Sequence, residues 1–315
     1  MSRINILQFS VLALIWGSSY TFIKVAGDGL TPAQLVLIRV VLGAVVLYVV
    51  LRITGGRLPA LGSVWAHIAV TATLGMVAPF LLLAWAEQRT SAALAGVLIA
   101  ATPLLTLATA TVVLTTERAT WRKTICFVLG LAGVVLVISP WSSELGLLMG
   151  QLAVVGAAVC YAAQTVYVRK MLSQRGIPPL VSATSQVLMA TVLQAIITPF
   201  IAWHTPSFSW GVLVSILLLG SIGTGVAYLL YFRLITDIGA ANAAAVNYLV
   251  PITAVLISVI TLGEPITWNM IVGTLVVLGA LAFAENRLSP RRWGAAPAPI
   301  ANSAPKPTAG ARGRD

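Results

Sequence analysis

Ten long apolar runs constrain the fold of this chain more than any other feature. A helix rises about 1.5 Å per residue, so roughly 20 apolar residues cross the hydrocarbon core of a bilayer. Short segments with turn-forming residues join the runs. The sequence therefore predicts an all-α integral membrane protein with ten transmembrane helices. The expected spans are residues 5–25, 34–51, 66–86, 92–114, 121–139, 145–168, 180–202, 211–232, 239–262 and 267–284.

The composition excludes several other classes of protein. Charged residues make up 9% of the 315 residues, against about 25% in soluble domains. The formal net charge of +11 does not indicate nucleic-acid binding, because the basic residues lie in turns and in the C-terminal segment. Cys126 and Cys160 lie inside apolar runs, which does not favour a disulfide framework. No nucleophile motif, phosphate loop, dinucleotide fingerprint or metal-ligand spacing occurs, so we expect no enzyme activity, cofactor or metal.

The positions of the basic residues predict the orientation in the membrane. Lys and Arg accumulate on the cytoplasmic side of membrane proteins. With the N-terminus inside, 16 of the 19 basic residues fall in cytoplasmic segments, Lys24 and Arg89 fall outside, and Arg39 lies within a span. Both termini are thus expected in the cytoplasm, with the multi-pass chain in a bacterial cytoplasmic membrane. Residues 286–315, rich in Pro, Ala and Gly, are predicted to be a disordered basic cytoplasmic tail.

The sequence repeats itself at an offset of about 145 residues. Seven landmarks recur in one order with a drift of at most three residues; Trp16 and Tyr161 are one such pair. Each half contains five expected spans, and an odd number inverts the second half relative to the first. We therefore interpret residues 5–139 and 145–285 as inverted five-helix repeats. Secondary transporters often have this architecture, with the substrate near the midplane between the repeats.

Motifs in both halves resemble those of a known family. The stretch W-G-S-S-Y-x-x-I-K near the start, P-x(13)-E from Pro103 to Glu117 and P-x(12)-E from Pro251 to Glu264 are similar to motifs of the drug/metabolite transporter superfamily, specifically the EamA-like permeases. The resemblance covers about residues 5–285. It implies a ten-helix bundle that works by alternating access and exports amino acids, related metabolites or drugs, often in exchange for protons. The substrate varies within the family and does not carry over.

A polar and aromatic stripe enters the first span and recurs in the second half. Trp16 and Tyr20 share a helix face at a spacing of four residues, and Ser19 lies round the turn. The matching stretch of the second half places Tyr161 and Gln164 at equivalent depth. We interpret these side chains as candidates for cavity lining between the halves. Close helix packing is an equal alternative for Ser19.

Arg39 is the most informative single residue, because it lies about 7–8 Å into the second span. Charges at such depth are costly and mark functional sites, although a long side chain near a span end can also reach the interface. Glu87, at the outer end of the third span, is the nearest possible partner, and Lys24 and Arg89 lie at similar height. We expect Arg39 and Glu87 to pair when the site is empty, and Arg39 or Lys24 to bind a substrate carboxylate. A static surface ion pair is the alternative.

The remaining candidates come from the fourth, eighth and ninth spans. Pro103 and Pro251 follow runs of small residues, interrupt helix hydrogen bonding and are predicted hinges. Asn247 and the adjacent Tyr248 are candidates for substrate contact, with bonding between helices as the alternative for Asn247. Tyr228 is a candidate for either the pore wall or core packing.

Together these features predict a secondary active transporter of a small molecule, which exports amino acids or related small metabolites across the bilayer. The alternative is a multidrug or toxic-compound exporter, which generally needs a membrane-embedded acid to exchange a proton for a cation. None of the eight acidic residues lies in the middle of a span, and only Glu87 has any depth. This weakens the expectation of a counter-transported proton. Either a monomer or a homodimer is compatible with the sequence.

Overall fold

The structure, a computed structural model, describes residues 2–114, 120–141, 143–201 and 204–284, and all regular secondary structure in them is helical. The predicted tail, 286–315, and Glu117 of the first P-x(13)-E motif lie outside these residues. Among the described residues, eight helical segments are long and apolar enough to cross a membrane, and two further apolar helices are shorter. The prediction of an all-α membrane protein is therefore confirmed, and helices occupy each expected apolar run.

The helices follow one another through short connections. The α-helices are α1 (Arg3–Ala26), α2 (Pro32–Ile53), α3 (Val64–Ala72), α4 (Ala78–Glu87), α5 (Ala92–Ile99), α6 (Thr102–Val113), α7 (Trp121–Ile138), α8 (Leu145–Tyr167), α9 (Pro179–Ile197), α10 (Trp210–Leu217), α11 (Ala227–Ile238), α12 (Ala240–Ala243), α13 (Val246–Leu262) and α14 (Trp268–Ala284). The π-helical segments are η1 (Thr73–Val77), η2 (Val168–Leu172) and η5 (Leu218–Val226), and the 3-10 turns are η3 (Ser173–Arg175) and η4 (Thr198–Phe200). The π-helical segments continue α3, α8 and α10 without a break.

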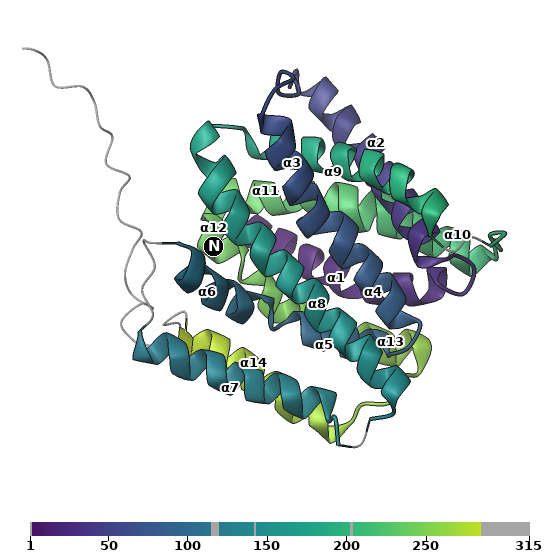
Figure 1. Cartoon of the computed structure of the whole chain (residues 1–315), viewed down its shortest axis with the longest axis vertical. Helices are drawn as coiled ribbons and strands as arrows, with labels where there is room; N and C mark the ends of the chain where they lie inside the picture. Colours follow the sequence, from purple (N-terminus) through teal and green to yellow (C-terminus); the bar gives the residue numbers. More distant parts are fainter. Residues whose placement is uncertain (1, 115–119, 142, 202–203, 285–315) are drawn as a thin grey trace, which may run out of the picture.

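Helices from the two halves of the chain pack against each other. The pairs are α1 with α13, α2 with α9 and η5, α4 with α8, and α7 with α14. The last pair lies along one edge of the molecule (Figure 1). The contact between α1 and α13 depends on Gly17, because a Cβ there would lie 2.1 Å from the hydroxyl oxygen of Thr253. That hydroxyl donates across the contact to the carbonyl of Ala13 at 2.9 Å. A small residue thus lets the backbones approach closely, as is common between membrane helices.

Two of the expected spans contain an interruption. One lies between α5 and α6 at Ala100–Ala101, and Pro103 is the second residue of α6, where its missing N–H removes no helical hydrogen bond. The other lies between α12 and α13 at Ala244–Ala245. Pro251 lies inside α13, so the interruption in this span precedes that proline by nearly two turns.

Candidate functional site

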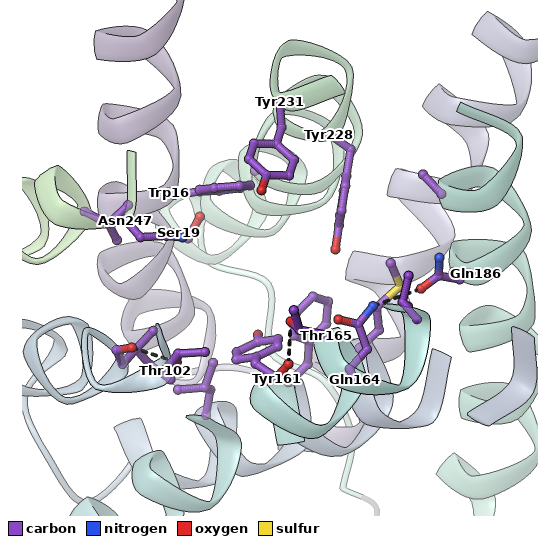
Figure 2. Close-up of a pocket in the computed structure, with 18 of the residues that line it drawn as sticks. Trp16, Ser19, Thr102, Tyr161, Gln164, Thr165, Gln186, Tyr228, Tyr231 and Asn247 are labelled. Atoms are coloured by element: carbon purple, nitrogen blue, oxygen red, sulfur yellow. Dashed lines mark hydrogen bonds between the residues drawn. The ribbon is translucent and has the colours of Figure 1, made fainter. Parts of the chain in front are cut away.

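A cavity of about 570 Å³ lies between the two halves of the chain. Its wall takes side chains from α1, α2, α4, α5 and α6 before residue 140, and from α8, α9, α11 and α13 after residue 145. In Figure 2, Trp16, Tyr228 and Tyr231 lie on one side of this space, and Tyr161 and Gln164 lie opposite them. Residues far apart in the sequence therefore meet around one space.

Most of the predicted site residues line this cavity. The lining members are Trp16, Ser19, Tyr20, Arg39, Pro103, Tyr161, Gln164, Tyr228, Asn247 and Pro251. Lys24, Glu87 and Tyr248 lie outside the wall. Tyr248 packs against the neighbouring hydrophobic core instead. The stripe from the first span and its counterpart in the second half thus line the same space.

Arg39 brings a cationic group into the cavity wall. Only 6% of the residue is exposed. Its guanidinium lies over the ring of Phe80, 3.7 Å from the centroid, and its Nε donates to the hydroxyl oxygen of Thr224 at 3.1 Å. Thr224 donates in turn to the carbonyl of Leu219 within η5. The ring and the hydroxyl hold the guanidinium in place, and neither Nη1 nor Nη2 donates a hydrogen bond to another described residue.

The expected ion pair between Arg39 and Glu87 is not formed. Both carboxylate oxygens of Glu87 are buried without a hydrogen-bond partner. The physical reason is position: Phe80, on which the guanidinium rests, precedes Glu87 by seven residues, or about 10 Å along the helix. The two side chains are therefore held about two turns apart, and the prediction of their pairing is wrong for this conformation.

Lys24 binds main-chain carbonyls rather than a carboxylate. Its Nζ donates to the carbonyl of Glu87 at 2.5 Å and to that of Thr90 at 2.9 Å. The connection between α4 and α5 is also held from the second half, because the carboxylate of Glu264 accepts the amides of Ala92 and Ala93 at 2.8 and 2.9 Å. These contacts join α1, the start of α5 and the segment before α14, and we call this region the closed end.

The cavity reaches the opposite end of the molecule. Its wall includes Leu172 and Ser173 beyond α8, and Ser173 is exposed. The other end of α8 contacts the closed end, since a Cβ on Gly150 would lie 3.2 Å from the carbonyl of Ala86. The segment from residue 150 to 172 spans about 33 Å as a helix. The cavity is thus accessible near the α8–α9 connection, which we call the open end.

The wall combines neutral polar groups with aromatic rings. Gln164 donates to the amide oxygen of Gln186 at 3.3 Å, and Gln186 donates to the hydroxyl of Ser182 at 3.0 Å. On the other side of the cavity, the rings of Trp16 and Tyr231 contact each other in a tilted arrangement, with their centroids 5.3 Å apart. Among the described lining residues Arg39 carries the sole formal charge, and none is Asp or Glu.

Sequence reasoning did not single out three residues that define the site. Phe80 and Thr224 hold Arg39, and Gln186 continues the polar wall from Gln164. Gln186 could have been found from the sequence, because it is an amide side chain within an apolar span, as Asn247 is. Phe80 could not have been found in this way, since aromatic residues are common in apolar runs. In the described part of the chain, no group of three or more His, Cys, Asp or Glu side chains is placed to hold a metal ion.

A multi-pass membrane protein with a cavity that reaches one end of its helix bundle has the architecture of a transporter. The model of the EamA-like transporter family matches residues 3–139 and 148–285, so the chain belongs to that family. A crystal structure with 18% sequence identity superposes with a TM-score of 0.63 over 92% of this chain and 100% of that chain, which shows a common fold.

Relatives of known name are also transporters. The uncharacterized transporter YdfC of Bacillus subtilis (strain 168) is 25% identical over 277 residues, which cover 88% of this chain and 89% of that protein. The probable terminal-alkyne amino-acid exporter of Streptantibioticus cattleyicolor is 25% identical over 283 residues, which cover 90% and 94%. The uncharacterized inner membrane transporter YedA of Escherichia coli (strain K12) is 24% identical over 288 residues, which cover 87% and 86%.

Proposed function

We propose that this chain is a secondary active transporter that exports amino acids or related carboxylate-bearing metabolites by alternating access. The observation that carries the proposal is Arg39: a buried guanidinium that faces the cavity and has no carboxylate partner among the described residues. A buried cation without a counter-ion is unfavourable until an anion binds. A substrate carboxylate, which accepts two parallel hydrogen bonds from a guanidinium, fits that position.

The architecture that supports alternating access is a pair of inverted repeats with ten spans. Five spans in residues 5–139 and five in 145–285 are supported by the recurring landmarks and by helices at every expected run. The packing of each half against the other, with side chains of both halves around the cavity, supports a substrate site at their shared interface. The interruptions near Pro103 and before Pro251 are then the positions at which the half-helices bend.

The difference between the two ends supports a state open on one side. The basic residues place the open end, near Arg175, on the cytoplasmic side, together with both termini. The closed end then faces the outside of a bacterial cytoplasmic membrane. Export requires the closed end to open after the substrate has entered from the cytoplasm. One chain encloses the whole cavity, so a monomer is sufficient, although a homodimer is compatible with this arrangement.

Three related probes test the substrate class by ligand-dependent thermal stability of the purified protein. L-Phenylalanine, 3-phenylpropanoate and 2-phenylethylamine share a ring that suits the aromatic wall and differ in their charged groups. A ligand that binds only the folded state stabilises it, by about 2.7 kcal/mol at one hundred times its Kd. We expect stabilisation by the two carboxylates and none by the amine. Stabilisation by the amine or by tetraphenylphosphonium alone would instead favour a multidrug exporter.

Glu264 provides a separate test of the closed end. Replacing it with alanine removes the acceptors of the Ala92 and Ala93 amides. Each hydrogen bond to a charged group contributes about 1.5–3 kcal/mol, so hydrogen exchange of these amides should accelerate at least about tenfold. Hydrogen–deuterium exchange with mass spectrometry measures this in the peptide that covers the start of α5. Glu144→Ala is the matched control, because Glu144 is an exposed N-cap without a side-chain capping bond. Equal exchange in both variants would contradict the role of Glu264.

A further inference from the structure

Glu87 is a buried acid that the substrate cavity does not use. It ends α4, is 1% exposed, and lies outside the cavity wall. Neither carboxylate oxygen has a hydrogen-bond partner. Buried polar atoms are almost always paired, so an acid with both oxygens unpaired requires an explanation.

Lys24 does not supply the missing partner. Its Nζ lies 2.5 Å from the main-chain carbonyl of Glu87, yet it bonds that carbonyl and the carbonyl of Thr90 instead of the carboxylate. An ammonium group beside an ionised carboxylate gains most by donating to it directly. Because Lys24 does not donate to the Glu87 carboxyl group, the geometry fits a neutral, protonated Glu87.

The other charged groups near Glu87 form hydrogen bonds with other partners. Besides Lys24 of α1, the charges that act on this carboxyl group are those of Arg39 on α2 and Glu264 before α14. Arg39 donates to Thr224, and Glu264 accepts the amides at the start of α5. The phenol of Tyr20, on α1, is near enough to be influenced by Glu87.

One further helix, α8, and the connection after α4 also lie at this end of α4. Helix α8 meets it at Gly150, which carries no titratable group. Arg89, two residues beyond Glu87, is exposed and stacks on Trp85 at 3.8 Å. An ionised Glu87 would thus be buried without a partner, a state that proteins avoid by keeping the group neutral.

We propose that Glu87 is a proton-binding site that carries a proton while the closed end is closed and releases it when Lys24 leaves the carbonyls of Glu87 and Thr90. Opening this end admits water and frees the ammonium group of Lys24. The O–H bond of the acid then breaks, the proton passes to water, and the carboxylate that remains pairs with Lys24. Closure requires the reverse transfer from the same side, so one proton is taken up each time this end closes and no net proton crosses the membrane.

The link to opening rests on the proposed alternating-access function, whereas the protonation of Glu87 in this conformation does not. A transporter built in this way opens its closed end more readily at high pH on that side, because the closed state holds the proton and the open state does not. The gating group lies beside the cavity, so the absence of acids among the described lining residues is compatible with this role.

Infrared spectroscopy of the protein in lipid tests the protonation without any substrate. The difference spectrum between the wild-type protein and Glu87→Gln at neutral pH should contain the carbonyl stretching band of a protonated carboxylic acid, and this band should shift in deuterated water. Glu264→Gln is the matched control: its carboxylate has two amide donors, so its difference spectrum should show only ionised carboxylate bands. A Glu87→Gln spectrum that shows only ionised carboxylate bands would overturn the proposal.

The thermal stability of Glu87→Gln gives a second, independent measurement. A neutral amide replaces a neutral acid of the same size, so the Tm should stay within about 2 °C of the wild-type value or rise. An ionised carboxylate that supports the fold through Lys24 would instead lower the Tm on replacement, and a fall larger than about 4 °C would overturn the proposal.

The pH dependence of transport in proteoliposomes tests the link to opening, with L-phenylalanine as the probe and the same pH on both sides. Transport by the wild-type protein should slow as the pH falls, because the protonated acid favours closure, and transport by Glu87→Gln should lose this dependence. A Glu87→Gln protein that keeps the wild-type pH dependence would overturn the link. If L-phenylalanine does not bind even the wild-type protein, the proposed substrate class is wrong. The infrared measurement then still decides whether Glu87 is protonated, because it uses no substrate.

Discussion

Replacement of Arg39 by alanine is expected to abolish the stabilisation of this transporter by carboxylate ligands. Arg39 is the sole charged residue among the described residues that line the cavity, and Phe80 and Thr224 hold its guanidinium in place. A hydrogen bond to a charged group contributes about 1.5–3 kcal/mol, so losing two of them lowers affinity by roughly 100-fold or more. The measurement is the shift in Tm with 3-phenylpropanoate, repeated for Arg39→Lys, which keeps the charge and loses the planar fork.

Two comparisons make the result for Arg39 decisive. Arg89→Ala is the matched control, because Arg89 is an exposed arginine that also stacks on an aromatic ring, Trp85, away from the cavity. It should respond to the ligand as the wild-type protein does. Size-exclusion chromatography establishes that each variant is folded before the ligand is added. A folded Arg39→Ala protein that is stabilised as strongly as the wild type would refute the proposed carboxylate site.

Replacement of Gly17 by alanine is expected to destabilise the protein through a single added methyl group. A Cβ at this position would lie 2.1 Å from the hydroxyl oxygen of Thr253 and 2.9 Å from the backbone nitrogen of Ala254. The helices α1 and α13 must then move apart, which also disturbs the bond from Thr253 to Ala13. Overpacking of this kind costs about 1–3 kcal/mol, equivalent to a fall in Tm of about 2–12 °C.

Gly279→Ala is the control for this steric argument. Gly279 also lies within an apolar helix, α14, but a Cβ there would meet no atom within 4 Å. Alanine is the better helix former, so Gly279→Ala should leave the Tm unchanged or slightly higher. Thermal unfolding of both variants in the same detergent makes the comparison. A similar response of the two variants would show that close approach at Gly17 does not limit stability.

Hydropathy and residue spacing were sufficient to predict the helices and much of the cavity wall. Each apolar run expected from the sequence contains a helix, because a segment in hydrocarbon must satisfy its backbone hydrogen bonds internally. The spacing of Trp16 and Tyr20 predicted a common face, and both residues line the cavity together with Tyr161 of the matching stretch. Arg39 stood out for the same reason: the energetic cost of its depth can be estimated from one segment alone.

Contacts between distant segments could not be predicted in this way. The sequence placed Arg39 and Glu87 at similar height, but their partners depend on how α2, α4 and η5 pack, which turns the guanidinium towards Phe80 and Thr224. The position of the interruption before Pro251 likewise depends on the surroundings of α13 and not on the proline alone.

The predictable and the unpredictable features of this protein differ in the range of the forces that set them. The helices, the depth of Arg39 and the stripe of Trp16 and Tyr20 follow from transfer into hydrocarbon and from helical periodicity, which act within about twenty residues. The contacts of Lys24 and the isolation of the Glu87 carboxyl group arise where segments far apart in the chain meet. Side-chain packing between those segments selects one arrangement among many of similar local energy, so these features require the tertiary structure.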